Sequence, residues 1–333
     1  MIVWIGFIAL ICGLLALDLG VLNREAHVVS TREALGWTSI WITLSLLFGG
    51  FVYFAYKHHW LGIGETIGTD MTGGEAFVIY LTGYLIEQSL SIDNVFVIAI
   101  IFNYFRIPNQ YQHRVLFWGI VGAIVFRGIM IVAGTYLLQQ FNWITYVFGA
   151  ILLYSAYRMF KHSYDSVDPE SNKVVNYFKK IFPVVNRIEG ESFFVIENGV
   201  RAATPLFIAL LVIETTDVMF AFDSIPAIFA ITRDPFIVFT SNIFAILGLR
   251  SLYFVLAAII GKFRYLQYSL VLILALVGVK MILLHYVHFP AWVSLLMVAV
   301  ILGGGIIASL IIKPKKEEEE LPEQLEKKEV PKM

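Results

Sequence analysis

Long apolar stretches alternate with short polar segments along the whole chain. Nine of these stretches have about 20 residues or more, the length that an α-helix needs to cross a bilayer core of about 30 Å. They lie at residues 2–22, 37–57, 76–102, 115–138, 141–160, 204–231, 237–260, 266–285 and 291–312. The pattern therefore predicts an all-α polytopic membrane protein with nine transmembrane helices.

Composition agrees with this prediction. Hydrophobic residues make up 59% of the chain and charged residues only 15%, whereas a soluble domain carries about 25% charge. The lipid bilayer is thus the expected partner, and nothing in the sequence specifies a protein partner. The formal net charge is −1 and no basic cluster resembles a nucleic-acid surface, so nucleic acid is not expected as a partner. With Cys12 as its single cysteine, the chain cannot form an intramolecular disulfide.

The positive charges predict the orientation. Nine spans place the two termini on opposite sides of the membrane. If the N-terminus is outside, 18 of the 24 Lys and Arg residues fall in cytoplasmic segments, and only Lys57 and Arg233 lie in external ones. Cytoplasmic segments carry the excess of positive charge in membrane proteins. We therefore expect an external N-terminus, a first stretch that is retained as a span, and a cytoplasmic C-terminus.

The predicted transmembrane domain covers residues 1–312 and is interrupted by a cytoplasmic loop at 161–203. Within the loop, the amphipathic stretch 174–182 predicts an interfacial helix. An Asn198-Gly199 pair between two short β-prone runs then predicts a hairpin. Residues 313–333 are charged throughout and predict a disordered tail.

Two parts of the chain, residues 76–160 and 204–285, align with each other as three-helix units. In this alignment Glu87 falls on Asp217, and Asp93 on Asp223. Arg127 falls on Arg250 in the second helix of each unit. Because three is an odd number of spans, the second unit has to enter the membrane from the opposite side. Such an inverted repeat is the architecture of many transporters that expose a central site alternately to the two sides.

Acidic residues within the predicted spans are the candidate chemistry. A charged side chain at the bilayer centre costs about 3 kcal/mol on insertion scales, so several of them together indicate a function. The candidates for metal binding are the five carboxylates and one amide at Glu87, Asp93, Asn94, Glu214, Asp217 and Asp223. Carboxylate, amide, hydroxyl and carbonyl oxygens suit Mn²⁺, Mg²⁺ or Ca²⁺ better than zinc or copper. The same carboxylates make proton antiport chemically possible.

Neighbouring polar groups extend this candidate site. Ser91 and Ser224 lie on the same helical faces as the acids, and Asn242 precedes Arg250 by two turns. Pro226 cannot donate a hydrogen bond to the carbonyl of Phe222, which predicts a kink and a free carbonyl ligand beside Asp223.

The basic residues within the spans have more than one interpretation. Arg127 and Arg250 either bridge the acids structurally or take the place of the cation when the site is empty. Arg158 and Lys280 lie near the predicted helix ends, from which they are expected to reach the headgroups.

Three long motifs carry a family resemblance. They are LTGYLIEQSLSIDNVFV at 81–97, ETTDVMFAFDSIPAIFA at 214–230 and DPFIVFTSNIFAILGLR at 234–250. They resemble the signatures of the TerC family of integral membrane proteins, in particular its Alx-like branch. This resemblance implies Mn²⁺ efflux across the bacterial plasma membrane, with tellurium resistance as the older label of the family. The family's acidic positions map onto the six metal candidates named above.

Two other classes of function compete with transport. A membrane-embedded enzyme is not expected, because His-Glu-x-x-His and Gly-x-Ser-x-Gly are absent and neither Asp93 nor Asp223 lies in a Gly-x-Gly-Asp context. An accessory protein that docks other membrane or secreted proteins through the 161–203 loop remains open. No cofactor is expected, since Mn²⁺ would be the transported substrate.

Overall fold

The structure, a computed structural model, describes residues 2–17, 30–161, 172–197, 199–257, 265–284 and 290–311. The tail predicted at 313–333 and the hairpin residue Asn198 lie outside these ranges. The elements are α1 (Ile2–Leu17), α2 (Thr31–Lys57), the 3-10 turn η2 (Trp60–Gly62), α3 (Gly73–Tyr104), α4 (Asn109–Gln140), α5 (Ile144–Lys161), α6 (Lys173–Ile181), β1 (Phe194–Glu197), β2 (Val200–Ala203), α7 (Pro205–Phe229), α8 (Pro235–Leu247), α9 (Leu249–Ala257), α10 (Leu266–Leu283) and α11 (Ala291–Ile311).

Each apolar stretch of the sequence coincides with a helix or with a pair of helices, and the predicted all-helical membrane architecture is confirmed at this level. Within the described residues, six helices are long and apolar enough to cross a membrane, namely α2, α3, α4, α7, α10 and α11. The pair α8 and α9 adds a seventh candidate. The described part of α1 has only 16 residues, and α5 does not pass the same test of length and composition. The number of nine spans stays a prediction.

A bend divides the span predicted at 237–260. Helix α8 ends at Leu247, and α9 begins at Leu249 in a direction that differs by 42°. Breaks inside membrane helices are tolerated where neighbouring helices surround the backbone. Here α2, α3 and α4 pack against both α8 and α9.

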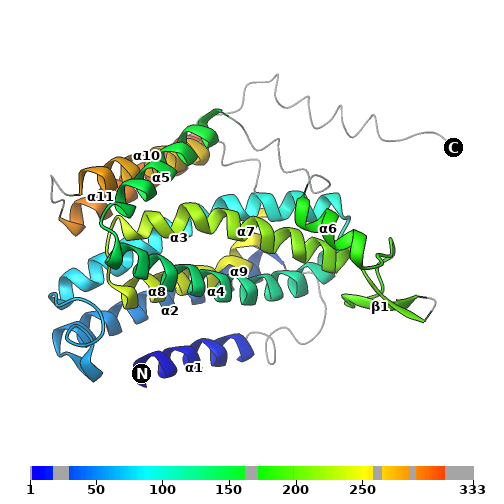
Figure 1. Cartoon of the computed structure of the whole chain (residues 1–333), viewed down its shortest axis with the longest axis horizontal. Coiled ribbons are helices and arrows are strands. Elements are labelled where there is room, and N and C mark those ends of the chain that lie inside the picture. Colours follow the sequence, from blue (N-terminus) through cyan, green and yellow to red (C-terminus); the bar gives the residue numbers. More distant parts are fainter. Residues whose placement is uncertain are drawn as a thin grey trace.

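Helix α3 is the centre of the molecule. It packs against α2, α7, α8 and α11, while α4 packs against α7 and α8 (Figure 1). Helices α5 and α10 pack mainly against each other and against α11 or α7, and they lie to one side of the central helices in Figure 1. This arrangement brings one face of α3, one of α4 and one of α7 together in the middle of the bundle.

The helix and the hairpin predicted in the 161–203 loop are present in the described residues, while the interfacial position of the helix stays a prediction. Helix α6 packs on α7, and Phe178 lies 5.3 Å from Phe207 between ring centroids. Strands β1 and β2 pair in antiparallel register directly before α7, at the end of the bundle where α6 lies (Figure 1). Arg114, near the start of α4, forms an ion pair of 2.9 Å with Glu191 in this segment. The loop is therefore attached to both α4 and α7.

Candidate functional site

Arg127 lies where α3, α4 and α7 meet, and it is only 1% exposed. Its Nη1 atom forms a salt bridge with Glu87 on α3, and its Nη2 atom lies 3.1 Å from Oδ1 of Asp217 on α7. The Nε atom adds a hydrogen bond of 3.4 Å to the other carboxylate oxygen of Asp217. Burial of an unpaired charge is costly, so the guanidinium and the two carboxylates stabilise one another in this position.

Two further oxygens complete the surroundings of the guanidinium. Nη1 of Arg127 donates to Oγ of Ser224 at 3.1 Å and to Oδ1 of Asn242 at 3.2 Å. The amide of Asn242 in turn donates to Oε2 of Glu87 at 3.0 Å, which ties α8 to α3. Four helices thus contribute to one buried polar cluster, which we call the Arg127 cluster: Glu87, Arg127, Asp217, Ser224 and Asn242.

Helical spacing explains why these residues face one another. Asp217 and Ser224 are seven residues apart, close to two full turns, and so share a face of α7. Glu87 and Asn94 have the same spacing on α3. Nδ2 of Asn94 donates to Oδ1 of Asp217 at 3.2 Å, and this contact continues the polar seam between the two helices. The structure therefore brings together three of the six predicted metal candidates, Glu87, Asn94 and Asp217.

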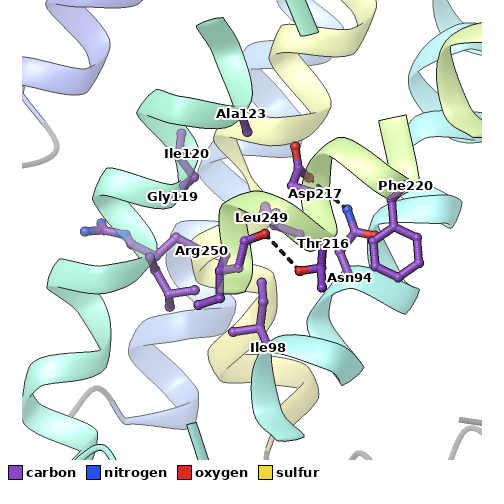
Figure 2. Close-up of a pocket in the computed structure, with 12 residues that line it drawn as sticks. Asn94, Ile98, Gly119, Ile120, Ala123, Thr216, Asp217, Phe220, Leu249 and Arg250 are labelled. Carbon is purple, nitrogen blue, oxygen red and sulfur yellow. Dashed lines mark hydrogen bonds between the residues drawn. The ribbon is translucent and has the colours of Figure 1, made fainter. Parts of the chain in front are cut away.

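A small cavity of about 20 Å³ adjoins the cluster, which is room for about one water molecule or one ion. Asn94, Thr216, Asp217 and Arg250 are among the residues that line it (Figure 2). Oδ1 of Asn94 and Oγ of Ser91 are buried, and neither has a hydrogen-bond partner within the described residues. Oδ1 of Asn94 is therefore a spare oxygen acceptor on a residue that bonds to the carboxylate of Asp217.

Glu214 lies about one turn before Asp217 on α7, and its carboxylate faces α4. Its carboxylate lies so close to Gly122 on α4 that a Cβ at position 122 would overlap with it. Oε2 of Glu214 is buried and has no hydrogen-bond partner in the described part of the chain. Sequence reasoning missed Gly122. The only available signal was a glycine in the middle of an apolar helix, which does not show what the glycine faces.

The other two predicted acids are not part of the described cluster. The side chain of Asp93 lies outside what the structure describes, although its backbone belongs to α3. Asp223 is partly buried, and its Oδ1 atom accepts a hydrogen bond of 2.5 Å from Ser155 on α5. Asp223 therefore faces α5, while its neighbour Ser224 faces Arg127.

The kink predicted at Pro226 stays a prediction. Helix α7 continues through Pro226 and ends only at Phe229. The side chain of Phe222 is 56% exposed and takes no part in the cluster.

One expectation about the basic residues needs correction, and it concerns Lys280. Lys280 does not reach toward headgroups: it is 6% exposed, and its Nζ atom donates to Oγ of Ser294 on α11 at 2.7 Å. Arg158, by contrast, is exposed. Arg250 is buried at the cavity, whereas Arg127, its counterpart in the sequence alignment, lies between two carboxylates.

The described residues contain no group of three or more His, Cys, Asp or Glu side chains that is close enough to hold a metal ion. At the Arg127 cluster two carboxylates meet, those of Glu87 and Asp217, and the guanidinium of Arg127 lies between them. Glu87 and Asp217 are therefore close together, but the guanidinium of Arg127 already pairs with both of their carboxylates.

Comparison with known proteins agrees with this picture of a membrane protein. A protein of Myxococcus xanthus named "Uncharacterized membrane protein STKORF319" is 48% identical over 299 residues, which cover 90% of this chain and 89% of the relative. A protein of Escherichia coli K12 named "Putative membrane-bound redox modulator Alx" is 43% identical over 295 residues, which cover 88% and 89% of the two chains. No solved structure matches the chain.

A family comparison covers most of the chain and includes every residue of the Arg127 cluster. Residues 72–317 match the integral membrane protein TerC family. Together with the extended identity to the Alx relatives, this places the sequence in the Alx-like branch. The chain belongs to the TerC family of integral membrane proteins.

Proposed function

We propose that this protein transports divalent metal cations, with Mn²⁺ efflux across the bacterial plasma membrane as its main activity. The observation that carries the proposal is the convergence of four oxygen-bearing residues from three helices on one buried cation, the guanidinium of Arg127. Helices α3 and α7, which supply the two carboxylates, are both long and apolar enough to cross a membrane. An acidic side chain within a membrane span costs free energy, and such residues typically mark an ion pathway.

The chemistry of the donors supports a hard divalent cation as substrate. Glu87 and Asp217 supply carboxylate oxygens, Asn242 an amide oxygen and Ser224 a hydroxyl oxygen. Such a set suits Mn²⁺, Mg²⁺ and Ca²⁺, and two carboxylates neutralise one dication. Coupling to protons is part of the proposal, because carboxylates that face the two sides in turn can exchange protons for the metal.

The packing of the helices supports an inverted repeat of two three-helix units. The first unit would consist of α3, α4 and α5. The second unit would consist of α7, the bent pair of α8 and α9, and α10. Equivalent helices pack against each other, α3 on α7 and α5 on α10, and the contact of α4 with α7 has its counterpart in that of α8 with α3. This pattern is expected for a twofold relationship within the membrane plane. Alternating access around the Arg127 cluster would follow.

Transport by the purified full chain in proteoliposomes tests the proposal. The parent protein is expected to carry Mn²⁺ down its gradient, with Mg²⁺ and Ca²⁺ as comparison ions and an internal pH dye to follow protons. Glu87→Gln and Asp217→Asn should each abolish the flux. Glu75→Gln is the matched control, because Glu75 is exposed at the start of the same helix α3. Parent vesicles that carry none of the three ions would contradict the proposal.

A second function, as an accessory protein in stress resistance or for other membrane or secreted proteins, is favoured by one observation. The hairpin of β1 and β2 exposes apolar side chains, with Ile196 74% and Val200 57% exposed. Exposed apolar groups on a small hairpin are typical of docking surfaces. Replacing both with Thr should then remove a co-purifying partner and leave Mn²⁺ flux unchanged. If flux and partner are lost together, the two roles are not separate.

A further inference from the structure

The Arg127 cluster has an unusual occupant for a candidate cation site. Every oxygen-bearing residue that the proposed function assigns to the ion in this cluster already binds the guanidinium: Glu87, Asp217, Ser224 and Asn242. Arg127 is 1% exposed, so water does not replace these contacts. A cation that enters the cluster has to take these oxygens away from the arginine.

We propose that Arg127 is a specificity-determining residue: its guanidinium is a built-in competitor that excludes monovalent cations from the site and yields only to a dication. This inference rests on the proposed function, whose substrate selectivity it explains. The competitor is permanent, because arginine keeps its proton in proteins. It is also tethered to α4, so it competes at a high effective concentration whatever the ions in solution.

Charge explains the selectivity. A sodium or potassium ion brings the same single charge as the guanidinium, but it would have to break at least five hydrogen bonds that hold Arg127 in place. A dication brings twice the charge to the same two carboxylates, and Coulomb attraction grows in proportion to charge. The exchange is therefore unfavourable for monovalent ions and accessible to divalent ones.

The cavity beside the cluster provides a place from which the exchange can begin. Asp217 belongs to both, since it binds Arg127 and also lines the cavity. Asn94 is 4% exposed and lines the same space, and its Oδ1 atom has no hydrogen-bond partner in the described structure. An ion in the cavity can therefore contact oxygens of Asn94 and Asp217 before Arg127 moves.

Metal binding to the full chain in lipid nanodiscs tests this role. Arg127→Gln keeps a polar side chain but removes the charge, and Arg127→Lys keeps the charge but has three N–H donors instead of five. If Arg127 occupies the site for at least nine-tenths of the time, its removal should tighten Mn²⁺ binding by about tenfold or more. Na⁺ should also compete with Mn²⁺ in Arg127→Gln at concentrations that leave the parent unaffected, and Arg127→Lys should be intermediate.

The control is Arg114→Gln, on the same helix α4 but paired with Glu191 outside the cluster, and it should bind Mn²⁺ as the parent does. An arginine with a purely structural role predicts weaker binding or a misfolded protein. Parent-like affinity and ion selectivity in either folded Arg127 variant would overturn the inference, as would failure of both to fold. A parent that binds and carries no metal would instead overturn the proposed function itself.

Discussion

The carboxylate of Glu214 on α7 rests against the backbone of α4 at Gly122, in space that any larger residue at position 122 would fill. Gly122→Ala should therefore push the carboxylate away or separate the two helices. We expect Mn²⁺ flux to fall by at least about tenfold, since small displacements at a binding site have large effects. Flux into proteoliposomes measures this.

The control for this substitution is Gly50→Ala in α2, where an added Cβ meets no atom within 4 Å. That variant should transport like the parent. Parent-like flux in Gly122→Ala would show that the position of the Glu214 carboxylate does not matter for transport.

Asp223 is expected to act separately from the Arg127 cluster, because its described hydrogen bond goes to Ser155 on α5. Asp223→Asn should change Mn²⁺ affinity by less than about twofold, as expected for independent sites, and should lower the transport rate. Asp217→Asn should weaken binding itself. Titration calorimetry combined with flux assays separates the two effects, and equal losses of affinity in both variants would place Asp223 in the same site.

Asn242 is expected to stabilise the fold as well as the site, because it bonds to both Arg127 and Glu87. Asn242→Ala leaves both partners short of a hydrogen bond in a buried position, which costs about 1–3 kcal/mol. Thermal unfolding in detergent should show a lower Tm. Ser241→Ala is the control, since the hydroxyl of Ser241 binds backbone carbonyls of its own helix. Equal Tm values for the two variants would argue against the cluster as a stabilising unit.

Orientation can be tested with single cysteines in a Cys12→Ser background. Asp70→Cys, in the loop before α3, should react with an impermeant thiol reagent in whole cells. Ser192→Cys, in the segment before β1, should react only after the membrane is opened. Both positions are exposed in the structure, so a difference in labelling reports the side of the membrane. The reverse pattern would contradict the external N-terminus and the inverted repeat together.

The sequence predicted most of the helices and part of the site, and the reasons for its failures are physical. Apolar length specifies where a helix lies, and seven-residue spacing specifies that Asp217 and Ser224 share a face. Neither specifies the angle at which a helix faces its neighbours. Asp223, next to Ser224 in sequence, therefore turned out to face α5, and Lys280 turned out to be buried against α11.

Arg127 and Arg250 also show that sequence does not predict which neighbours a side chain faces. Their equivalent positions in the sequence alignment led to the same two interpretations for both. In the structure, Arg127 binds both carboxylates of the cluster, and Arg250 is among the residues that line the cavity. Sequence similarity between repeats describes what the two halves share. If the protein works by alternating access, as proposed, a single conformation places the two units in different surroundings, and that difference exists only in three dimensions.

The bend between α8 and α9 has a mechanical consequence. Its two arms carry Asn242, bound in the cluster, and Arg250, at the cavity. An added Cβ at Gly248, between them, would meet its nearest atom at 3.5 Å, so crowding does not require a glycine there. Alanine is the stiffer choice in a helix. Gly248→Ala would thus stiffen the bend between α8 and α9 while leaving its packing nearly intact. The substitution would therefore show how far the site depends on flexibility at this bend, as distinct from the shape of the helices.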